Sequence, residues 1–224
     1  GVVNCIDPTS DKDDVASVEA QTEVAKKLIQ HTTYPILNRM EWLRRNTNNS
    51  NLTNQNIKFQ FSNTILESLS NLIKAWKYDN TAYLNNEAKA SELKANNWSF
   101  WSEGTVSFGK TGDSIISSAK KIQTSAITIG ADRRADNSRM VGLAIRLGND
   151  DIGIDNAKSS LDLDTVNLTL YESRLHGEDK FIDSLIGMGL FKTDIVNAVG
   201  SSSTKGERDG TQVFGSFKIR ETFK

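Results

Sequence analysis

The chain has 224 residues, enough for one large or two small domains, and a formal net charge of -1 that gives no indication of a nucleic-acid partner. No apolar run reaches the eighteen or so residues of a transmembrane helix. That excludes helical insertion only, because a transmembrane strand needs roughly 9 to 11 residues with every second one apolar. The single cysteine, Cys5, has no His or Cys cluster near it, so we expect neither an internal disulfide nor a metal site.

The first 97 residues are polar and helical in character, with Asn-rich breaks. Apolar residues recur at helical spacing over residues 11–45, where Pro35 is expected to end or kink the helix. A second helical stripe covers residues 63–76. Ordinary helix packing would explain both stripes. Because the sequence starts at GVVNC without an initiator Met, we expect it to be a piece of a longer protein.

Residues 103–114 read EGTVSFGKTGDS, in which two glycines, Lys110 and Thr111 have the spacing of a phosphate-binding loop. Such a loop follows a buried apolar strand and opens a helix. Here the preceding segment alternates large and small residues, Val106 and Phe108 continue that alternation, and no helical stripe follows. We therefore expect a strand that leads into a loop.

From Trp98 onward the apolar period changes from helical to two, which is typical of strands. Six segments alternate in this way, each about as long as a bilayer crossing requires. The segments are residues 98–108, 125–133, 140–148, 165–173, 181–191 and 211–221. In a soluble sandwich the apolar face packs on another sheet, whereas in a membrane barrel it meets lipid. Alternation alone does not separate these two folds.

The lengths of the connections favour the barrel. We predict long connections near residues 109–122, 148–162 and 193–210, and short ones at DRRADNSR and SRLHGEDK. This alternation places all long loops on one side of the sheet, as in outer-membrane barrels with long extracellular loops and short periplasmic turns. The first strand would then run outward from the periplasm.

The alternation also assigns the strand residues to two faces. The apolar face is expected to meet lipid, and its residues are Trp98, Phe100, Val106, Phe108, Ile127, Ile129, Val141, Leu143, Ile145, Leu147, Val166, Leu168, Leu170, Ile186, Met188, Leu190, Val213, Phe217 and Ile219. The polar face is expected to line the lumen, and its residues are Glu103, Thr128, Asp132, Arg146, Asn167, Asp183, Lys218 and Arg220. Small residues on the polar side, mostly glycines, either leave space for a plug or helix or mark bends and bulges.

Three segments, NWSFWSEGTVSFGKTGD, SAITIGADRRADNSRMVGLAIRLGNDD and EDKFIDSLIGMGLFKTD, resemble the translocator (β) domain of autotransporters, the type V secretion proteins of Gram-negative outer membranes. The resemblance lies in the order and spacing of a Trp-led strand, a TIGAD strand, a VGLAI strand and a DSLIGMG strand, and it covers residues 98–224. It implies a helix that threads the lumen toward the periplasm and leads into the first strand of a twelve-stranded barrel.

We therefore expect an all-β fold with a helical N-terminal lead: a transmembrane antiparallel β-barrel of which about six of twelve strands are present. Residues 1–97 would form a helical linker between passenger and barrel, and residues 98–224 the first half of the barrel. For the lumenal helix we favour residues 63–76 over residues 15–45, because they lie nearer the first strand. An unclosed six-stranded sheet would leave open edges in lipid.

The resemblance implies a protein that anchors an N-terminal passenger in the Gram-negative outer membrane and exports it to the cell surface. The implied partners are outer-membrane lipid, the passenger, the barrel-assembly machinery and periplasmic chaperones, with no nucleic acid. Two alternatives remain from the residues: a passive pore or adhesin barrel, and a soluble extracellular β-sandwich that binds a ligand.

We expect no catalytic, cofactor-binding or metal-binding residues. His31 and His176 have no carboxylate or nucleophile at a suggestive spacing, so we expect both to be solvated. Some family members cleave themselves at a lumenal Asn, but the Asn-Asn pairs at 48–49, 85–86 and 96–97 are expected in an Asn-rich chain. Lysines 110, 120 and 121 either meet outer-leaflet phosphates or belong to a solvated loop.

Overall fold

The computed structural model describes residues 12–46, 52, 98–154, 159–177, 180–199 and 202–221, which form one helix and six strands. The elements are α1 (Lys12–Arg45), β1 (Trp98–Thr111), β2 (Lys120–Asp136), β3 (Arg139–Ile154), β4 (Ser159–His176), β5 (Lys180–Val199) and β6 (Ser202–Glu221). The one helix of these ranges lacks the apolar stretch that a membrane-crossing helix requires.

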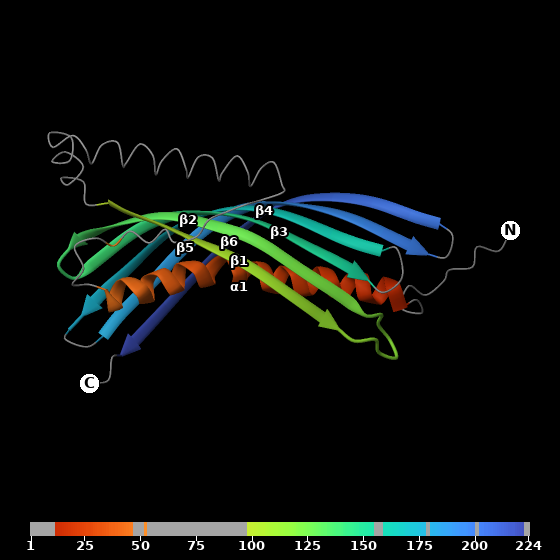
Figure 1. Ribbon diagram of the computed structural model, residues 1–224, viewed down its shortest axis with the longest axis horizontal. Helices are drawn as coiled ribbons and strands as arrows, with labels where there is room; N and C mark the ends of the chain where they lie inside the picture. The colour runs from red at the N-terminus through yellow and green to blue at the C-terminus, as the bar shows by residue number, and fades with distance from the viewer. Residues whose placement is uncertain are drawn as a thin grey trace.

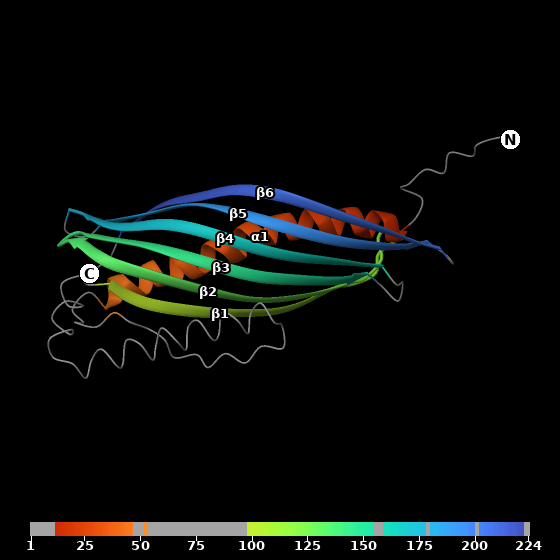
Figure 2. The same cartoon turned by 90° about the horizontal axis from the view of Figure 1, so that it is seen from above.

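The six strands form one antiparallel sheet in sequence order, β1-β2-β3-β4-β5-β6 (Figure 2). The sheet is curved, and it arches over α1, which lies along its concave side (Figure 1). The predicted fold of six antiparallel strands with a helical N-terminal lead is confirmed. The sheet is not closed, since β1 and β6 form its two ends.

The strands are longer than the alternation predicted, with 14 residues in β1 and 20 in both β5 and β6. Two of the three predicted long loops are therefore wrong: β3 continues to Ile154, β4 begins at Ser159, and β5 and β6 are separated by residues 200–201 alone. Among the connections between consecutive strands, only residues 112–119 are long. Backbone pairing continues where the apolar alternation stops, because ladder hydrogen bonds need no apolar side chains.

We expected Pro35 to end or kink the helix near Tyr34. The expectation that the helix ends there is wrong, because α1 runs unbroken through 34 residues. At 1.5 Å per residue this helix is roughly 51 Å long. Residues on both sides of the proline, including Thr32 and Ile36, are 1% exposed, so packing against the sheet fixes the helix before and after it. Tertiary contacts thus outweigh the single intrahelical hydrogen bond that proline removes.

The helix runs from the long 112–119 connection toward the end of the sheet where β1 begins. At its start the carbonyl of Lys12 accepts a hydrogen bond from the backbone N–H of Ser118 (3.4 Å), and at its end Arg44 contacts Asp183 near the β4–β5 turn. Residues 63–76, which the sequence favoured for this position, lie outside the described residues. The helix that occupies the concave face is α1.

Apolar contacts hold α1 to the sheet in two separate clusters. The cluster near the helix N-terminus contains Ala16, Ala20, Val24, Leu28, Ile122, Ile152, Ile154, Leu161 and Leu163. The cluster near its C-terminus contains Ile36, Leu37, Met40, Trp101, Ala144, Tyr171, Leu185 and Phe214. Between them, around His31 and Thr32, the sheet presents polar side chains to the helix.

Candidate functional site

The concave face of the sheet, covered by α1, is the candidate functional site. All eight residues predicted to face the lumen lie on it, according to the strand register and their contacts with α1: Glu103, Thr128, Asp132, Arg146, Asn167, Asp183, Lys218 and Arg220. Five of them are also buried: Thr128, Asp132, Arg146, Asn167 and Asp183. Buried polar groups on a sheet face are costly unless they are paired, so their partners determine what this face does.

Arg39 of α1 and Asp132 of β2 form the main ion pair between helix and sheet. The Arg39 Nε donates to Asp132 Oδ2 (2.7 Å) and Nη2 donates to Oδ1 (2.9 Å), a two-point contact that fixes both position and orientation. Asp132 Oδ2 also accepts from the Tyr171 hydroxyl, which in turn accepts from Trp101 Nε1, both at 2.8 Å. Four side chains from α1, β1, β2 and β4 are thereby joined in one buried hydrogen-bonded chain.

A second ion pair lies nearer the C-terminal end of α1. Arg44 Nη1 donates to Asp183 Oδ1 of β5 at 2.7 Å, and Ser173 of β4 donates to the same oxygen at 2.7 Å. Arg220 of β6 approaches Asp183 at 3.6 Å and Glu41 of α1 at 3.3 Å. The last two turns of the helix are therefore anchored to three neighbouring strands.

The N-terminal end of α1 carries carboxylates that bind the opposite end of the sheet. Asp13 accepts from Ser118 (2.6 Å) and Asp14 accepts from Asn197 (2.7 Å). Glu19 pairs with the Nζ of Lys120, which points inward and is 4% exposed. The three lysines therefore lie on two faces of the sheet. Lys120 is on the concave face, whereas Lys110 and its register partner on β2, Lys121, are exposed on the opposite face.

Glycines of the concave face lie directly beneath large side chains of the neighbouring strand. The pairs are Gly130 with Trp101, Gly142 with Tyr171, Gly187 with Phe214, Gly189 with Asn167 and Gly210 with Phe191. In each pair a Cβ built on the glycine would lie within 2.4 Å of the opposing side chain. The space predicted at the first four glycines is filled by these side chains, which lie flat on the sheet and let α1 approach it.

The convex face carries every residue predicted to meet lipid, according to the strand register. Thirteen of these side chains are exposed to extents between 39% at Leu143 and 75% at Phe108, and five are partly buried: Trp98, Phe100, Ile129, Val141 and Leu147. Ile127 differs, since it shares the face but is only 1% exposed. An apolar surface of this extent on one side of a sheet indicates a contact with lipid or protein.

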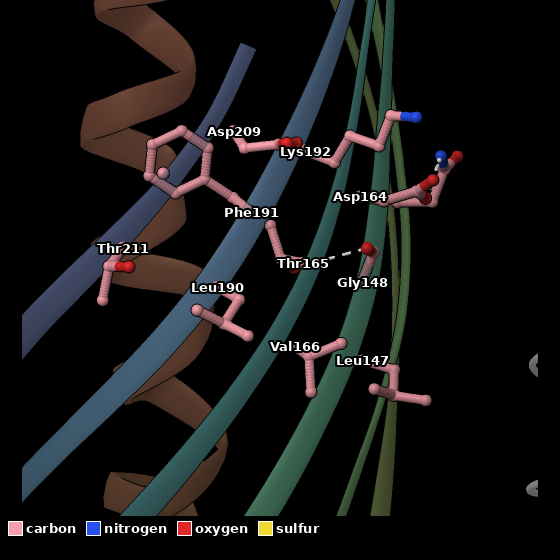
Figure 3. Close-up of a pocket in the computed structure, with 12 residues that line it drawn as sticks. Leu147, Gly148, Asp164, Thr165, Val166, Leu190, Phe191, Lys192, Asp209 and Thr211 are labelled. Carbon is pink, nitrogen blue, oxygen red and sulfur yellow. Dashed lines mark hydrogen bonds between the residues drawn. The ribbon is translucent and has the colours of Figure 1, made fainter.

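The apolar part of the convex face ends abruptly. Leu147, Val166 and Leu190 are register partners on β3, β4 and β5, and the row two residues further along contains Asp164 and Lys192 (Figure 3). A shallow groove lies across this change of polarity. The boundary resembles the edge of the apolar band of a membrane barrel.

The two histidines lie in different environments. His176 is exposed at the end of β4, but the expectation of a solvated His31 is wrong in part, since its Nδ1 is buried against the sheet without a hydrogen-bond partner among the described residues. The same ranges contain no cluster of three or more His, Cys, Asp or Glu residues that would suit a metal ion. Cys5 and the three Asn-Asn pairs lie outside them.

Sequence reasoning missed the side chains that bind the helix to the sheet. Trp101 was not assigned to a face, although its odd position places it with Glu103 on the concave side. Arg39 and Arg44 had no local signal, because their partners lie 93 and 139 residues away in the chain. The alternation of β4 did place Tyr171 on the same face as Asn167. That was the available sign that Tyr171 lies on the concave face.

An antiparallel sheet with an exposed apolar face, and a polar face filled by a helix, defines the class: part of an outer-membrane β-barrel. The family model for the autotransporter β-domain matches residues 100–224, more than half of the chain. The chain therefore belongs to the autotransporter β-domain family, and its location is the Gram-negative outer membrane.

The chain is similar to a solved structure, the translocator domain of autotransporter NalP from Neisseria meningitidis, with 15% sequence identity and a TM-score of 0.46. The match covers 61% of this chain and 50% of that chain, so it spans about half the length of the NalP domain. No curated protein sequence matches the chain.

Proposed function

We propose that this chain contributes the first half of an autotransporter translocator, which exports a passenger joined to the N-terminal side of α1 and anchors it at the cell surface. The observation that carries the proposal is the position of α1. The helix fills the polar face of the sheet, and its two ends are bound to opposite ends of that face. Its direction, toward the end where β1 begins, agrees with a chain that enters the lumen from outside.

The distribution of burial supports a membrane barrel over a soluble sandwich. In a sandwich the apolar sheet face is the covered one. Here Met188 and Leu190 on the apolar face are 56% and 64% exposed, whereas Asp132 and Asp183 on the polar face are 0% and 1% exposed. We therefore assign the convex face to lipid and the concave face to the lumen.

The helix contacts also support the translocator over a passive pore. An open pore would leave its lumenal charges in water, whereas Asp132 and Asp183 are each bound by an arginine of α1. Residues 1–97 would then serve as the linker to the passenger, and residues 98–224 as the first half of the barrel. The passenger is the cargo, and we propose no catalytic role for the chain.

The open edges of the sheet supply a reason for assembly partners. Unpaired strand edges with exposed apolar side chains aggregate in water and are not tolerated in lipid. We therefore propose that periplasmic chaperones hold the chain before insertion and that the barrel-assembly machinery closes it.

The proposal is tested by placing an epitope tag just before Lys12 in the full-length protein and expressing it in a Gram-negative host. We expect protease added to intact cells to remove the tag while the barrel remains folded, as judged by its heat-modifiable migration. A folded barrel whose tag is protected in intact cells, and cleaved only after the outer membrane is opened, would refute export. A second tag in the β2–β3 turn, at residues 137–138, should show the opposite accessibility.

A further inference from the structure

The interface between α1 and the sheet contains a buried cation that forms no ion pair among the described residues. Arg146 of β3 is 2% exposed, and its only hydrogen bond among the described residues is a long one of 3.4 Å from Nη1 to the Thr165 hydroxyl. Its Nε and Nη2 atoms are buried and unpaired. These two atoms form the side of the guanidinium that binds anions at two points, as Arg39 does with Asp132.

The position of the guanidinium is fixed by its surroundings. It lies over Gly148, where a built Cβ would be 2.4 Å from Nη1 and 3.1 Å from Cζ. The nearest acidic group along the strand, Asp150, accepts a hydrogen bond from the Thr124 hydroxyl and makes no ion pair with Arg146 within the described ranges. Any side chain at position 148 would displace the guanidinium, so the glycine keeps its free side in the interface.

Other buried polar groups, on the row of the Arg146 backbone and next to the row over which its guanidinium lies, also lack partners. Thr128 of β2 and Asn167 of β4 are the register partners of Arg146 on its two sides, and each is 1% exposed. The Thr128 hydroxyl and the Asn167 Nδ2 are unpaired within the described part of the chain, as is the buried Nδ1 of His31 on α1. His31 is close enough to Arg146 and Asp150 for their charges to act on it.

This polar layer separates the two apolar clusters that hold α1, so the clusters close it off from both sides. Buried polar groups in folded proteins almost always have partners, and an unpaired buried charge is especially unfavourable. The free groups are mainly donors beside a positive charge. A cation is therefore disfavoured. The charge of Asp150 acts on the guanidinium, but it leaves Nε and Nη2 of Arg146 without a hydrogen-bond acceptor, and water would add no negative charge there.

We propose that Arg146, with Asn167 and His31 near it, binds a small inorganic monoanion of the halide type between the sheet and α1. The anion would balance the charge of the guanidinium and accept hydrogen bonds from its two unpaired N–H groups, at Nε and Nη2. This site is separate from the ion pairs that hold the helix ends, and it does not depend on what the passenger is. Halide binding would strengthen the seating of α1 in the lumen.

The test uses the full-length protein in detergent at constant ionic strength, with sodium chloride replaced stepwise by sodium gluconate. We expect the thermal midpoint for loss of the folded species to rise with chloride by at least about 2 °C. An Arg146→Met variant should have a midpoint that does not depend on chloride. An Arg139→Met variant, which loses an exposed arginine at the β2–β3 turn, should respond as the unmodified protein does.

A second measurement keeps the proposal testable if Arg146→Met does not fold. Crystals of the full-length protein grown with sodium bromide should show an anomalous bromine peak beside Nε and Nη2 of Arg146. An Arg146→Lys variant, which keeps the charge and loses the two-point geometry, should show weaker chloride dependence. The proposal is overturned if the midpoint of the unmodified protein does not depend on chloride, or if no bromine peak lies at Arg146.

Discussion

The indole ring of Trp101 lies over Gly130, its register partner on β2, so closely that a Cβ built on the glycine would be 2.4 Å from the ring. Real Cβ atoms do not approach other atoms to that distance. The hydrogen bond from the same indole to Tyr171 depends on this position, and Tyr171 donates in turn to Asp132. One glycine therefore supports a chain of hydrogen bonds that joins side chains of β1, β4 and β2 to Arg39 of α1.

Replacing Gly130 with Ala should destabilise the folded barrel by about 1 to 3 kcal/mol, because the added methyl group displaces the indole from its place on the sheet. The measurement is the temperature at which full-length protein in detergent loses its heat-modifiable folded form. Gly153→Ala on β3 is the matched control, since a Cβ there would meet no atom within 4 Å. Equal effects of the two substitutions would contradict the proposed role of Gly130.

Removing one partner of the Arg39–Asp132 ion pair should cost more stability than removing both partners. Arg39 has a side chain that is 3% exposed and Asp132 one that is 0% exposed, so Arg39→Met leaves a buried carboxylate without its counterion. We expect a loss of about 3 to 5 kcal/mol in the stability of the folded form. Chemical unfolding of the full-length protein in detergent measures the loss.

A double substitution separates this effect from a general loss of packing. Arg39→Met combined with Asp132→Leu removes both charges, and we expect it to be more stable than Arg39→Met alone. Arg45→Met, which removes an arginine with a side chain that is 76% exposed, should change stability by less than about 0.5 kcal/mol. Additive losses at Arg39 and Asp132 would show that the pair is not coupled.

A charge at Leu168 tests whether the convex face meets lipid. Leu168 is 45% exposed in the middle of β4, and Leu168→Lys would place an ammonium group near the bilayer midplane at a cost of roughly 2 to 4 kcal/mol. The amount of folded protein in the outer membrane should fall. Ser203→Lys, at an exposed position of β6 beyond the apolar surface, is the comparison and should fold normally. Full tolerance of Lys at 168 would argue for a face in water.

Four carboxylates stand in one row across the convex face, because Asp151, Asp162, Asp194 and Glu207 are successive register partners on β3 to β6. Like charges opposite each other destabilise a sheet. Asp162→Asn should therefore stabilise the protein by roughly 0.2 to 1 kcal/mol at low salt, after allowance for solvent screening. The gain should shrink at 1 M salt, where the Debye length is about 3 Å. An unchanged or negative effect at low salt would contradict repulsion within the row.

The face on which each strand residue lies was predictable from sequence. Successive side chains of a strand point to opposite faces, so the alternation of apolar and polar residues shows which residues share a face. Ile145 and Arg146 differ by one position and lie on opposite faces, as the pattern indicated. The ends of the strands were not predictable in this way. Beyond the apolar surface, as at Asn149 and Ile152, backbone pairing continues without the alternation that marks a lipid contact, so strand was mistaken for loop.

The helix shows the other limit of sequence reasoning. Pro35 is a local signal for a break, and the local signal was outweighed by packing at Ile36 and Met40, whose partners on the sheet lie far along the chain. The pairing of Arg39 with Asp132 also has no local counterpart. Which side chains a helix binds on the concave face depends on which strand positions face it, and predicting these positions requires the register as well as the alternation.

The two ends of α1 carry opposite charges, and these charges favour one direction of the helix along the concave face of the sheet. Carboxylates at Asp13 and Glu19 meet donors at one end, and Arg39 and Arg44 meet acids at the other. A helix in the reverse direction would bring its arginines close to Lys120 and its carboxylates close to Asp132 and Asp183. Like charges would then face each other at both ends. The concave face therefore favours one direction of the helix over the reverse one. Under the proposed function, this preference would fix the direction of the exported chain relative to the barrel.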